Sequence, residues 1–183
     1  MRDLALGMPI MSQETLAEES GKEITVRKIL PEDKRAIVSL LRTCWDSELV
    51  TSRGNVYDAS TLPGFVAIDR NKSIQGLVTL TVSGGSCEIV TIDALQQGIG
   101  IGSLLFDSVV QLCREHGVTS LWLVTTNDNL NALKFYQKRG MRMLELYPGA
   151  IDFARANLKP QIPALGQNGI PLRDEIKLEL TII

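Results

Sequence analysis

Three glycines alternate with other residues in the segment 97–103, and this spacing could bind phosphate. Gly98, Gly100 and Gly102 follow an apolar run at residues 87–94 and precede a helical pattern. Glycine has no Cβ atom, so a turn built from it can direct backbone N–H groups toward a ligand. The unpaired N–H groups and the dipole at the start of the helix would add to a site for phosphate or pyrophosphate. A glycine-rich connection that binds nothing has the same pattern, so the turn alone leaves both interpretations open.

Two common nucleotide-binding motifs do not fit this segment. The dinucleotide motif GxGxxG requires a third glycine at position 103 or 105, where Ser103 and Leu105 stand. The phosphate-binding loop of ATPases requires a Lys-Ser or Lys-Thr pair that is absent here. Neither motif explains the turn, although a nucleotide-binding domain of unrelated chemistry stays open as an alternative.

The elements on either side would place this turn at the end of a strand. The pattern of residues 87–94 predicts that strand, and apolar residues at helical spacing from Ile101 predict a helix that stops at Gly117. Residues 121–125 are nearly all apolar, which is typical of a strand covered on both faces. The order of strand, glycine-rich turn, helix and strand would place any phosphate bound by the turn between the end of a strand and the start of a helix.

The rest of the chain supplies the other elements of an α/β (α+β) domain. A helix capped by Asn127 or Asp128 would follow the apolar strand and end at Gly140. The segment 45–64 is polar, contains glycine and proline breakers and is expected to be a loop. Alternation predicts strands at residues 23–29, 65–68, 74–82, 141–146 and 175–182, and helical spacing predicts helices at about 31–44 and 151–158.

Length and composition restrict the class of protein. The chain has 183 residues, which suit one domain. We expect residues 1–22 to be a weakly ordered N-terminal tail and residues 23–183 to be that domain. With a formal net charge of −2, the protein lacks the positive electrostatic field that nucleic-acid binding requires. No stretch approaches the roughly 20 apolar residues that span a bilayer, so neither nucleic acid nor a membrane is an expected partner.

The cysteines indicate a reducing compartment. Cys44, Cys87 and Cys113 are scattered along the chain, and His116 is the only histidine. This spacing does not fit a structural metal site, so no metal is expected. An odd number of scattered cysteines is typical of small buried residues in a cytoplasmic protein.

Two motifs, in the right order and at a matching separation, resemble those of one enzyme superfamily. The pattern Gln97-x-x-Gly100-x-Gly102 resembles the Gln/Arg-x-x-Gly-x-Gly/Ala signature of the GNAT N-acetyltransferases. Residues 129–141 resemble the family's N-x-x-A-x-x-Φ-Y-x-x-x-G-Φ segment, where Φ is apolar. The resemblance, specific over residues 88–141, implies a GNAT-like mixed, mostly antiparallel sheet of about seven strands. That sheet would splay after its fourth strand and be flanked by helices.

The resemblance also implies where acetyl-CoA or CoA would bind. The pantetheine arm would lie in the opening of the sheet and hydrogen-bond to the strand before the turn, and the pyrophosphate would sit on the amides of the turn. Asn129 would reach the arm, while Ala132 and Phe135 would flank its thiol end. The implied cofactor-binding residues are Ile92, Asp93, Ala94, Gln97, Gly98, Ile99, Gly100, Ile101, Gly102, Ser103, Asn129, Ala132, Phe135 and Tyr136.

Tyr136 and Glu88 are the catalytic residues that the resemblance implies. The family's usual general acid is a tyrosine at the position of Tyr136, and a phenol of pKa ~10 can protonate a departing thiolate of pKa ~8.5. By pattern alone Tyr136 would be a core residue, because aromatic residues at helical spacing usually pack. Glu88 would be the general base. A solvated acid at the strand start and a water relay are alternatives, and Asp93 is the other nearby carboxylate.

In this family the amine acceptor binds between two segments, which here are residues 45–64 and 147–174. The first carries Arg53 with Trp45 and Tyr57 on either side, and these three are the candidate substrate-binding residues. The planar fork of arginine suits bidentate binding of a carboxylate, so our hypothesis is that Arg53 holds a carboxylate on a small amine. The alternative is a solvated arginine paired with Asp46, Glu48 or Asp58.

The expected function is transfer of an acetyl group from acetyl-CoA to a primary amine by direct attack in a ternary complex. The acceptor would be a small molecule or a peptide, and a homodimer is compatible with the family. The alternative function is a catalytically silent CoA-binding or sensing module of the same fold. The phenol of Tyr136 favours the enzyme.

Overall fold

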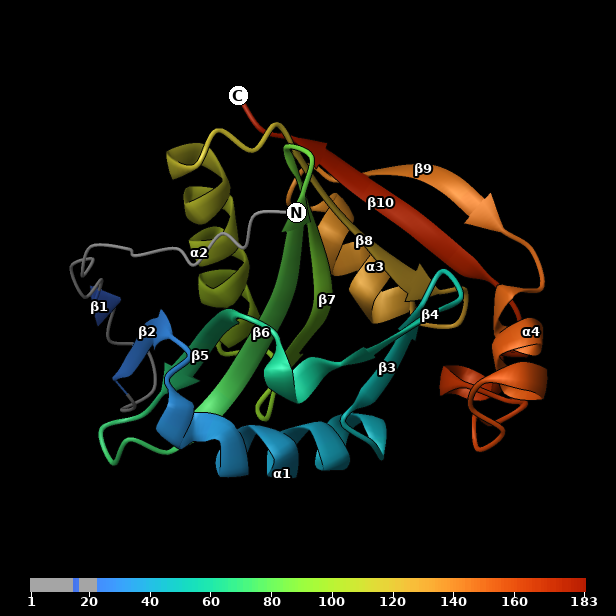
Figure 1. The fold of residues 1–183 in the computed structure, drawn as a ribbon, viewed down its shortest axis with the longest axis horizontal. Coiled ribbons are helices and arrows are strands. Elements are labelled where there is room, and N and C mark those ends of the chain that lie inside the picture. The colour runs from blue at the N-terminus through green and yellow to red at the C-terminus, as the bar shows by residue number, and fades with distance from the viewer. Residues whose placement is uncertain (1–14, 17–22) are drawn as a thin grey trace.

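A mixed β-sheet carries the fold, with α1 (Lys34–Trp45) on one face and α2 (Ile101–Glu115) and α3 (Leu130–Gln137) on the other (Figure 1). The computed structural model describes residues 15–16 and 23–183. In spatial order the strands are β1 (Thr15–Leu16), β2 (Ile24–Lys28), β5 (Gly64–Ile68), β6 (Ile74–Ser83), β7 (Ser86–Ala94), β8 (Ser120–Thr126), β10 (Glu175–Thr181) and β9 (Arg142–Tyr147).

Neighbouring strands are antiparallel except β7 and β8. The expected mostly antiparallel sheet of about seven strands is confirmed, with the two-residue β1 added at one edge.

The sheet opens between β7 and β8. These parallel strands pair only from Ser86 with Ser120 to Glu88 with Trp122, although both continue well beyond that point. Residues 89–94 of β7 therefore have no strand partner on this side within the described residues. β7 is the fourth of the longer strands in spatial order, so the expected splay after the fourth strand is confirmed.

Two hydrophobic clusters hold the helices to the sheet. α2 and α3 pack on one cluster, which includes the buried thiols of Cys87 and Cys113, and α1 packs on the other. Cys44 is exposed, so the expectation that all three cysteines are buried was wrong for this one. Its position near the end of an amphipathic surface helix leaves it on the solvent side. Residues at the centres of the clusters are Leu105, Phe106, Val109, Leu121 and Leu178 in the first and Ile37, Leu41, Val66 and Leu77 in the second.

The segment 45–64 contains a β-hairpin, which corrects the expectation of a loop. β3 (Leu49–Ser52) pairs with β4 (Asn55–Asp58), and a short 3₁₀ helix, η2 (Ala59–Thr61), follows. Arg53 and Gly54 form the two-residue connection, with φ of +50° and +75°. Such turns favour Asn-Gly or Asp-Gly because both residues are left-handed. Because arginine occupies the first turn position, the sequence lacks the Asn-Gly or Asp-Gly pair that would have predicted a hairpin.

The helix cap of α3 also differs from expectation. Asn129 is the N-cap, and its Oδ1 accepts a hydrogen bond from the backbone N–H of Ala132 at 3.1 Å. Asn127 and Asp128, the expected caps, instead bind backbone groups of the segment 167–174. All three residue types can cap a helix, so sequence pattern alone could not choose between them.

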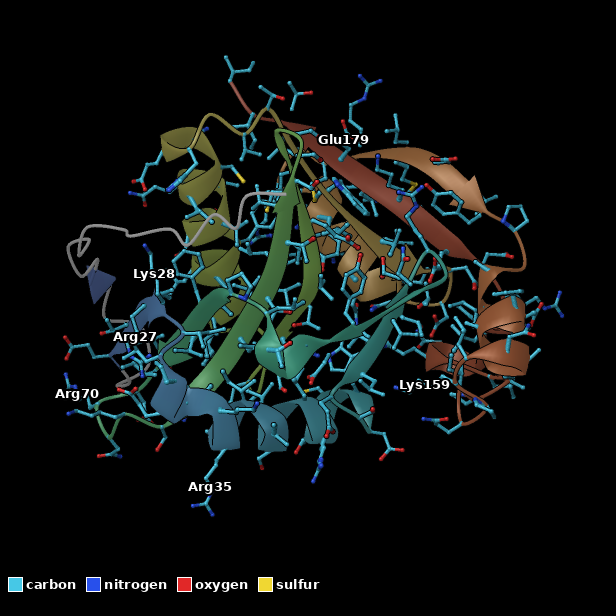
Figure 2. All side chains as sticks on the ribbon, viewed as in Figure 1. Arg27, Lys28, Arg35, Arg70, Lys159 and Glu179 are labelled. Carbon is cyan, nitrogen blue, oxygen red and sulfur yellow. The ribbon has the colours of Figure 1, made fainter. Side chains whose placement is uncertain are left out.

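A lysine ties the end of α4 (Ala150–Asn157) to the opposite side of the open sheet. Lys159, labelled in Figure 2, donates from Nζ to the backbone oxygens of Trp45 and Leu49, each at 3.2 Å. A cation at the last carbonyls of a helix is favourable. The end of α1, the start of the hairpin and the C-terminal segment are thereby held together.

Within residues 15–16 and 23–183, no helix is long and apolar enough to cross a bilayer. The same residues contain no group of three or more His, Cys, Asp or Glu side chains that could hold a metal ion.

Candidate active site

The glycine-rich turn presents a row of free backbone donors. Gly98 and Gly100 have φ of +82° and +87°, a conformation that residues with a Cβ atom rarely adopt. Gly100 is the N-cap of α2, and its carbonyl accepts from Ser103 and Leu104. The N–H groups of residues 96–102 donate to no described residue. Consecutive free N–H groups at a helix start form an anion site that fits a pyrophosphate.

Arg139 supplies a positive charge beside this turn. Its guanidinium lies 3.6 Å from the centroid of the Phe135 ring and donates to the Phe135 carbonyl and to Oγ of Ser103. A Cβ atom at Gly102 would contact that ring at 3.4 Å. Arg139 lies inside the predicted motif segment but was not predicted as a site residue, because the motif leaves this position unspecified.

The strand before the turn carries a partly buried carboxylate. Asp93 lies on the part of β7 that has no β8 partner, between Ile92 and Ala94. Its Oδ2 accepts a hydrogen bond from Nε1 of Trp45 at 2.8 Å. Burial raises the pKa of Asp93 to about 6, and the Trp45 hydrogen bond opposes this. Trp45 therefore lies beside the predicted cofactor strand, and it does not line the pocket described below.

The pKa of Asp93 gives a prediction for stability. The raised pKa means that the folded protein disfavours the ionised form of Asp93. The free energy of unfolding is therefore highest, as far as Asp93 is concerned, below about pH 3.8, and it falls as the pH rises through about 6. Asp93→Asn removes the charge, and its amide oxygen can still accept from Trp45. We expect the variant to be more stable than wild type by about 1–3 kcal/mol at pH 8, with the difference vanishing below pH 4. Urea unfolding at both pH values measures this, and equal differences at both would contradict it.

Tyr136 combines a buried ring with a free hydroxyl. The side chain is 7% exposed, and its ring centroid lies 5.2 Å from that of Phe135 and 6.4 Å from that of Phe106. Its hydroxyl forms no hydrogen bond with a described residue. Every fully buried polar side-chain atom among the described residues has a hydrogen-bond partner. The hydroxyl oxygen must therefore be accessible. Burial, and then the nearby Asp93 charge, raise the pKa of Tyr136, while Arg139 opposes them. The phenol thus stays protonated near neutral pH.

Glu88 lies inside the protein. It is 4% exposed and accepts from Oγ of Ser52 at 2.7 Å and from Oη of Tyr57 at 3.1 Å. The alternative of a solvated acid at the strand start is therefore wrong, because β3 and β4 of the hairpin cover it. Burial and the Glu88 carboxylate raise the pKa of Tyr57, so both hydroxyls act as donors to Glu88.

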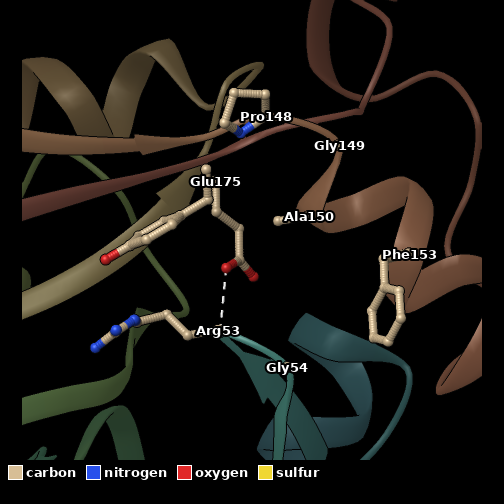
Figure 3. A pocket seen from close by; sticks show the side chains of 8 residues that line it. Arg53, Gly54, Pro148, Gly149, Ala150, Phe153 and Glu175 are labelled. Carbon is tan, nitrogen blue, oxygen red and sulfur yellow. Dashed lines mark hydrogen bonds between the residues drawn. The ribbon is translucent and has the colours of Figure 1, made fainter.

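A pocket of about 350 Å³ lies between the hairpin tip and the start of α4 (Figure 3). Glu175, at the start of β10, is 4% exposed and accepts from the backbone N–H of Arg53 at 3.1 Å. This carboxylate was not predicted, since a glutamate that begins a strand carries no motif. The pocket is lined by Arg53, Gly54, Tyr147, Pro148, Gly149, Ala150, Phe153 and Glu175.

The Arg53 guanidinium is held by aromatic rings. Its Cζ lies 5.5 Å from the ring centroid of Trp122 and 5.3 Å from that of Tyr147. It has no ion pair or side-chain hydrogen bond with a described residue. The alternative pairing with Asp46, Glu48 or Asp58 is not observed: Glu48 binds Arg42, and Asp58 caps η2.

The structure thus gathers some predicted site residues and separates others. Arg53, Tyr57 and Glu88 lie in and under the hairpin, while Trp45 contacts Asp93. Asn129 caps α3 with its amide oxygen.

Comparisons with known proteins agree with this fold. Residues 34–141 match the family model described as acetyltransferase (GNAT) family. The protein YxbD of Bacillus subtilis (strain 168) is 36% identical over 145 residues, which cover 79% of this chain and 91% of YxbD.

Two solved structures share the fold. The IAA acetyltransferase from Bacillus cereus ATCC 14579 has a TM-score of 0.62 and 22% identity, covering 86% of this chain and 99% of that one. A GNAT family acetyltransferase from Elizabethkingia anophelis with acetyl-CoA bound has a TM-score of 0.62 and 22% identity, covering 86% and 97%. Since the family model spans more than half of the chain, the protein belongs to the acetyltransferase (GNAT) family.

Proposed function

We propose that this protein transfers an acetyl group from acetyl-CoA to a primary amine by direct attack in a ternary complex. The proposal rests on the row of free N–H groups at residues 96–102 together with the accessible hydroxyl of Tyr136. The first feature fits a pyrophosphate and the second fits a leaving thiolate. A reducing, cytoplasmic location is supported by the free thiols of the three cysteines.

Acetyl-CoA would be held by the residues around the sheet opening. The turn would bind its pyrophosphate, Arg139 would add a cation, and the open edge at residues 92–94 of β7 would accept the pantetheine arm. Ala132, Phe135 and the Nδ2 of Asn129 would lie along that arm. When bound, acetyl-CoA supplies an activated thioester.

Two side chains of the protein would each take part in one proton transfer. Tyr136 holds a proton on its phenol and would give it to the leaving sulfur. Glu88 would accept the proton that the amine nitrogen loses on attack. Both of its oxygens are occupied by the hydroxyls of Ser52 and Tyr57, so this proton would pass through one of them.

The acceptor would enter at the hairpin tip. The Arg53 guanidinium, stacked between Trp122 and Tyr147 and free of any ion pair with the described residues, supports our hypothesis of a carboxylate-bearing amine. The neighbouring Phe153 and Ala150 add apolar surface for its remainder.

The test is a thiol-release assay with acetyl-CoA and a panel of amines. The panel pairs amino acids with their decarboxylated analogues and adds polyamines, aminoglycosides and peptide N-termini. Amine-dependent release of CoA supports the proposal. Binding of acetyl-CoA without release for any amine would instead favour the silent CoA-binding module.

Arg53→Ala should raise KM for a carboxylated acceptor roughly 10–150-fold if KM tracks binding, because a charge-assisted contact is worth about 1.5–3 kcal/mol. The decarboxylated analogue should be barely affected. Arg70→Ala is the matched control, since Arg70 pairs with Glu23 on the surface. Equal effects of Arg53→Ala on both acceptor types would remove Arg53 from the site.

A further inference from the structure

We propose that Glu175 is a second catalytic carboxylate, which binds the ammonium group of the incoming acceptor and takes its first proton. This inference rests on the proposed amine acetyltransferase function and adds a residue to it. It also defines the acceptor more closely, as an amine that arrives protonated at the pocket between the hairpin and α4. The argument rests on the position of one oxygen atom, on the groups around it and on the route to solvent.

One carboxylate oxygen of Glu175 accepts a hydrogen bond from the protein, and the other accepts none from a described residue. Oε2 accepts from the backbone N–H of Arg53, and Oε1 bonds to no described residue. No buried polar side-chain atom in the described part of the chain lacks a partner, so Oε1 must be accessible. Glu175 lines the pocket, and Figure 3 shows its carboxylate reaching into the space between Arg53, Ala150 and Phe153. A buried carboxylate with one oxygen open to a pocket suits a cationic ligand.

Glu88 offers no such oxygen. Ser52 occupies its Oε1 and Tyr57 its Oε2. An ammonium group that enters the pocket would therefore meet Glu175 first. The two carboxylates lie close enough for the charge of Glu88 to act on Glu175, although they come from opposite sides of the sheet opening. The described pocket lining carries one carboxylate, Glu175, and one cation, Arg53, and the charge of Glu88 also acts on Glu175. This balance favours a positively charged group at the amine end of the acceptor.

The surroundings also suit proton transfer. Burial raises the pKa of Glu175 most, the Arg53 backbone N–H and charge lower it, and the Glu88 charge raises it. Tyr147, on β9, lines the same pocket. Burial disfavours both charged forms and so brings the pKa values of the ammonium and of Glu175 closer, while the contact between the two charges acts in the opposite direction. One N–H bond breaks and one O–H bond forms at Oε1. The neutral amine moves on, and Glu175 returns the proton to solvent through the pocket opening.

The variant Glu175→Gln distinguishes a role as proton acceptor from a purely structural role, in which Glu175 only holds the hairpin through the Arg53 N–H. The glutamine Oε1 can still accept from the Arg53 N–H, so folding and the hairpin position should be kept. With the best acceptor of the panel, we expect kcat/KM to fall about 10–100-fold, as for a lost charge-assisted contact. The acid limb of its pH profile should move or disappear, which an anchoring role would not cause. Glu115→Gln is the matched control, because Glu115 is exposed at the end of α2 and accepts a hydrogen bond from Gln111. It should stay within about twofold of wild type, as surface substitutions usually do.

A binding experiment tests Glu175 without any turnover. The side-chain carboxyl of Glu175 is followed by ¹³C NMR during pH titration and assigned with Glu175→Gln. Methylammonium should lower its titration midpoint, because a bound cation favours the carboxylate. Tetramethylammonium, which has the same charge and no N–H, should not. An unchanged midpoint with methylammonium, or an unchanged kcat/KM and pH profile in Glu175→Gln, would overturn the proposal. Absence of CoA release by wild type would overturn the acetyltransferase function alone.

Discussion

Tyr136→Phe should lower turnover at saturating substrates by at least tenfold, because a general acid contributes about 10²–10⁴-fold. The substitution removes the one accessible hydroxyl on an otherwise buried ring. The ring contacts with Phe106 and Phe135 are kept, so acetyl-CoA affinity should change little. Single-turnover thiol release measures the chemical step, and calorimetric titration measures the affinity.

The melting temperature is the control for this variant. The Tyr136 hydroxyl bonds to no described residue, so its loss should leave stability nearly unchanged. An unfolded variant would therefore be unexpected. Unchanged turnover, under conditions where chemistry limits the rate, would show that Tyr136 only packs.

Gly100→Val should abolish the stabilisation of the protein by acetyl-CoA. Gly100 has φ of +87° and caps α2, so valine there is strained and places a branched side chain beside the free N–H groups. At 100 times its dissociation constant, a ligand stabilises by about 2.7 kcal/mol, which raises the melting temperature of wild type by about 5–10 °C. Differential scanning calorimetry with and without acetyl-CoA measures the shift.

Gly85→Val is the matched control for this prediction. Gly85 lies in the distant turn between β6 and β7, has φ of +77° and has open space around its Cβ position, as Gly100 does. Both variants therefore carry similar backbone strain, and only Gly100→Val should lose the ligand-induced shift. A folded Gly100→Val that keeps the full shift would show that the turn does not bind the cofactor.

The elements around the proposed acetyl-CoA site were predictable because they depend on local sequence. Gly100 and Tyr136 lie in two short motifs whose spacing is set by one strand and two helices. Backbone N–H groups at a helix start need only the glycines and the helix that follows. The fold was predictable for the same reason, because the hydrophobic periodicity of its long strands and helices is a property of local sequence.

The acceptor side was less predictable because it depends on contacts between distant segments. Arg53 and Glu175 are separated by 122 positions in the chain, and neither belongs to a sequence motif. The hairpin that joins them was missed because its strands have four residues each and its turn begins with arginine. Glu88 was predicted, but its burial came from Ser52 and Tyr57, which only the hairpin pairing brings to it.

The hairpin has a consequence for how such an enzyme can diversify. Ser52, Arg53 and Tyr57 all lie on residues 49–58, a continuous stretch that contributes neither the glycine-rich turn nor Tyr136. Under the proposed function, exchange of this short stretch between relatives would change which amine is accepted, while the proposed donor site would be inherited intact. New acceptors would then require only a few substitutions within one hairpin, because connecting segments tolerate change better than the elements that support them. Divergence among relatives should accordingly concentrate in this hairpin and in the segment that faces it.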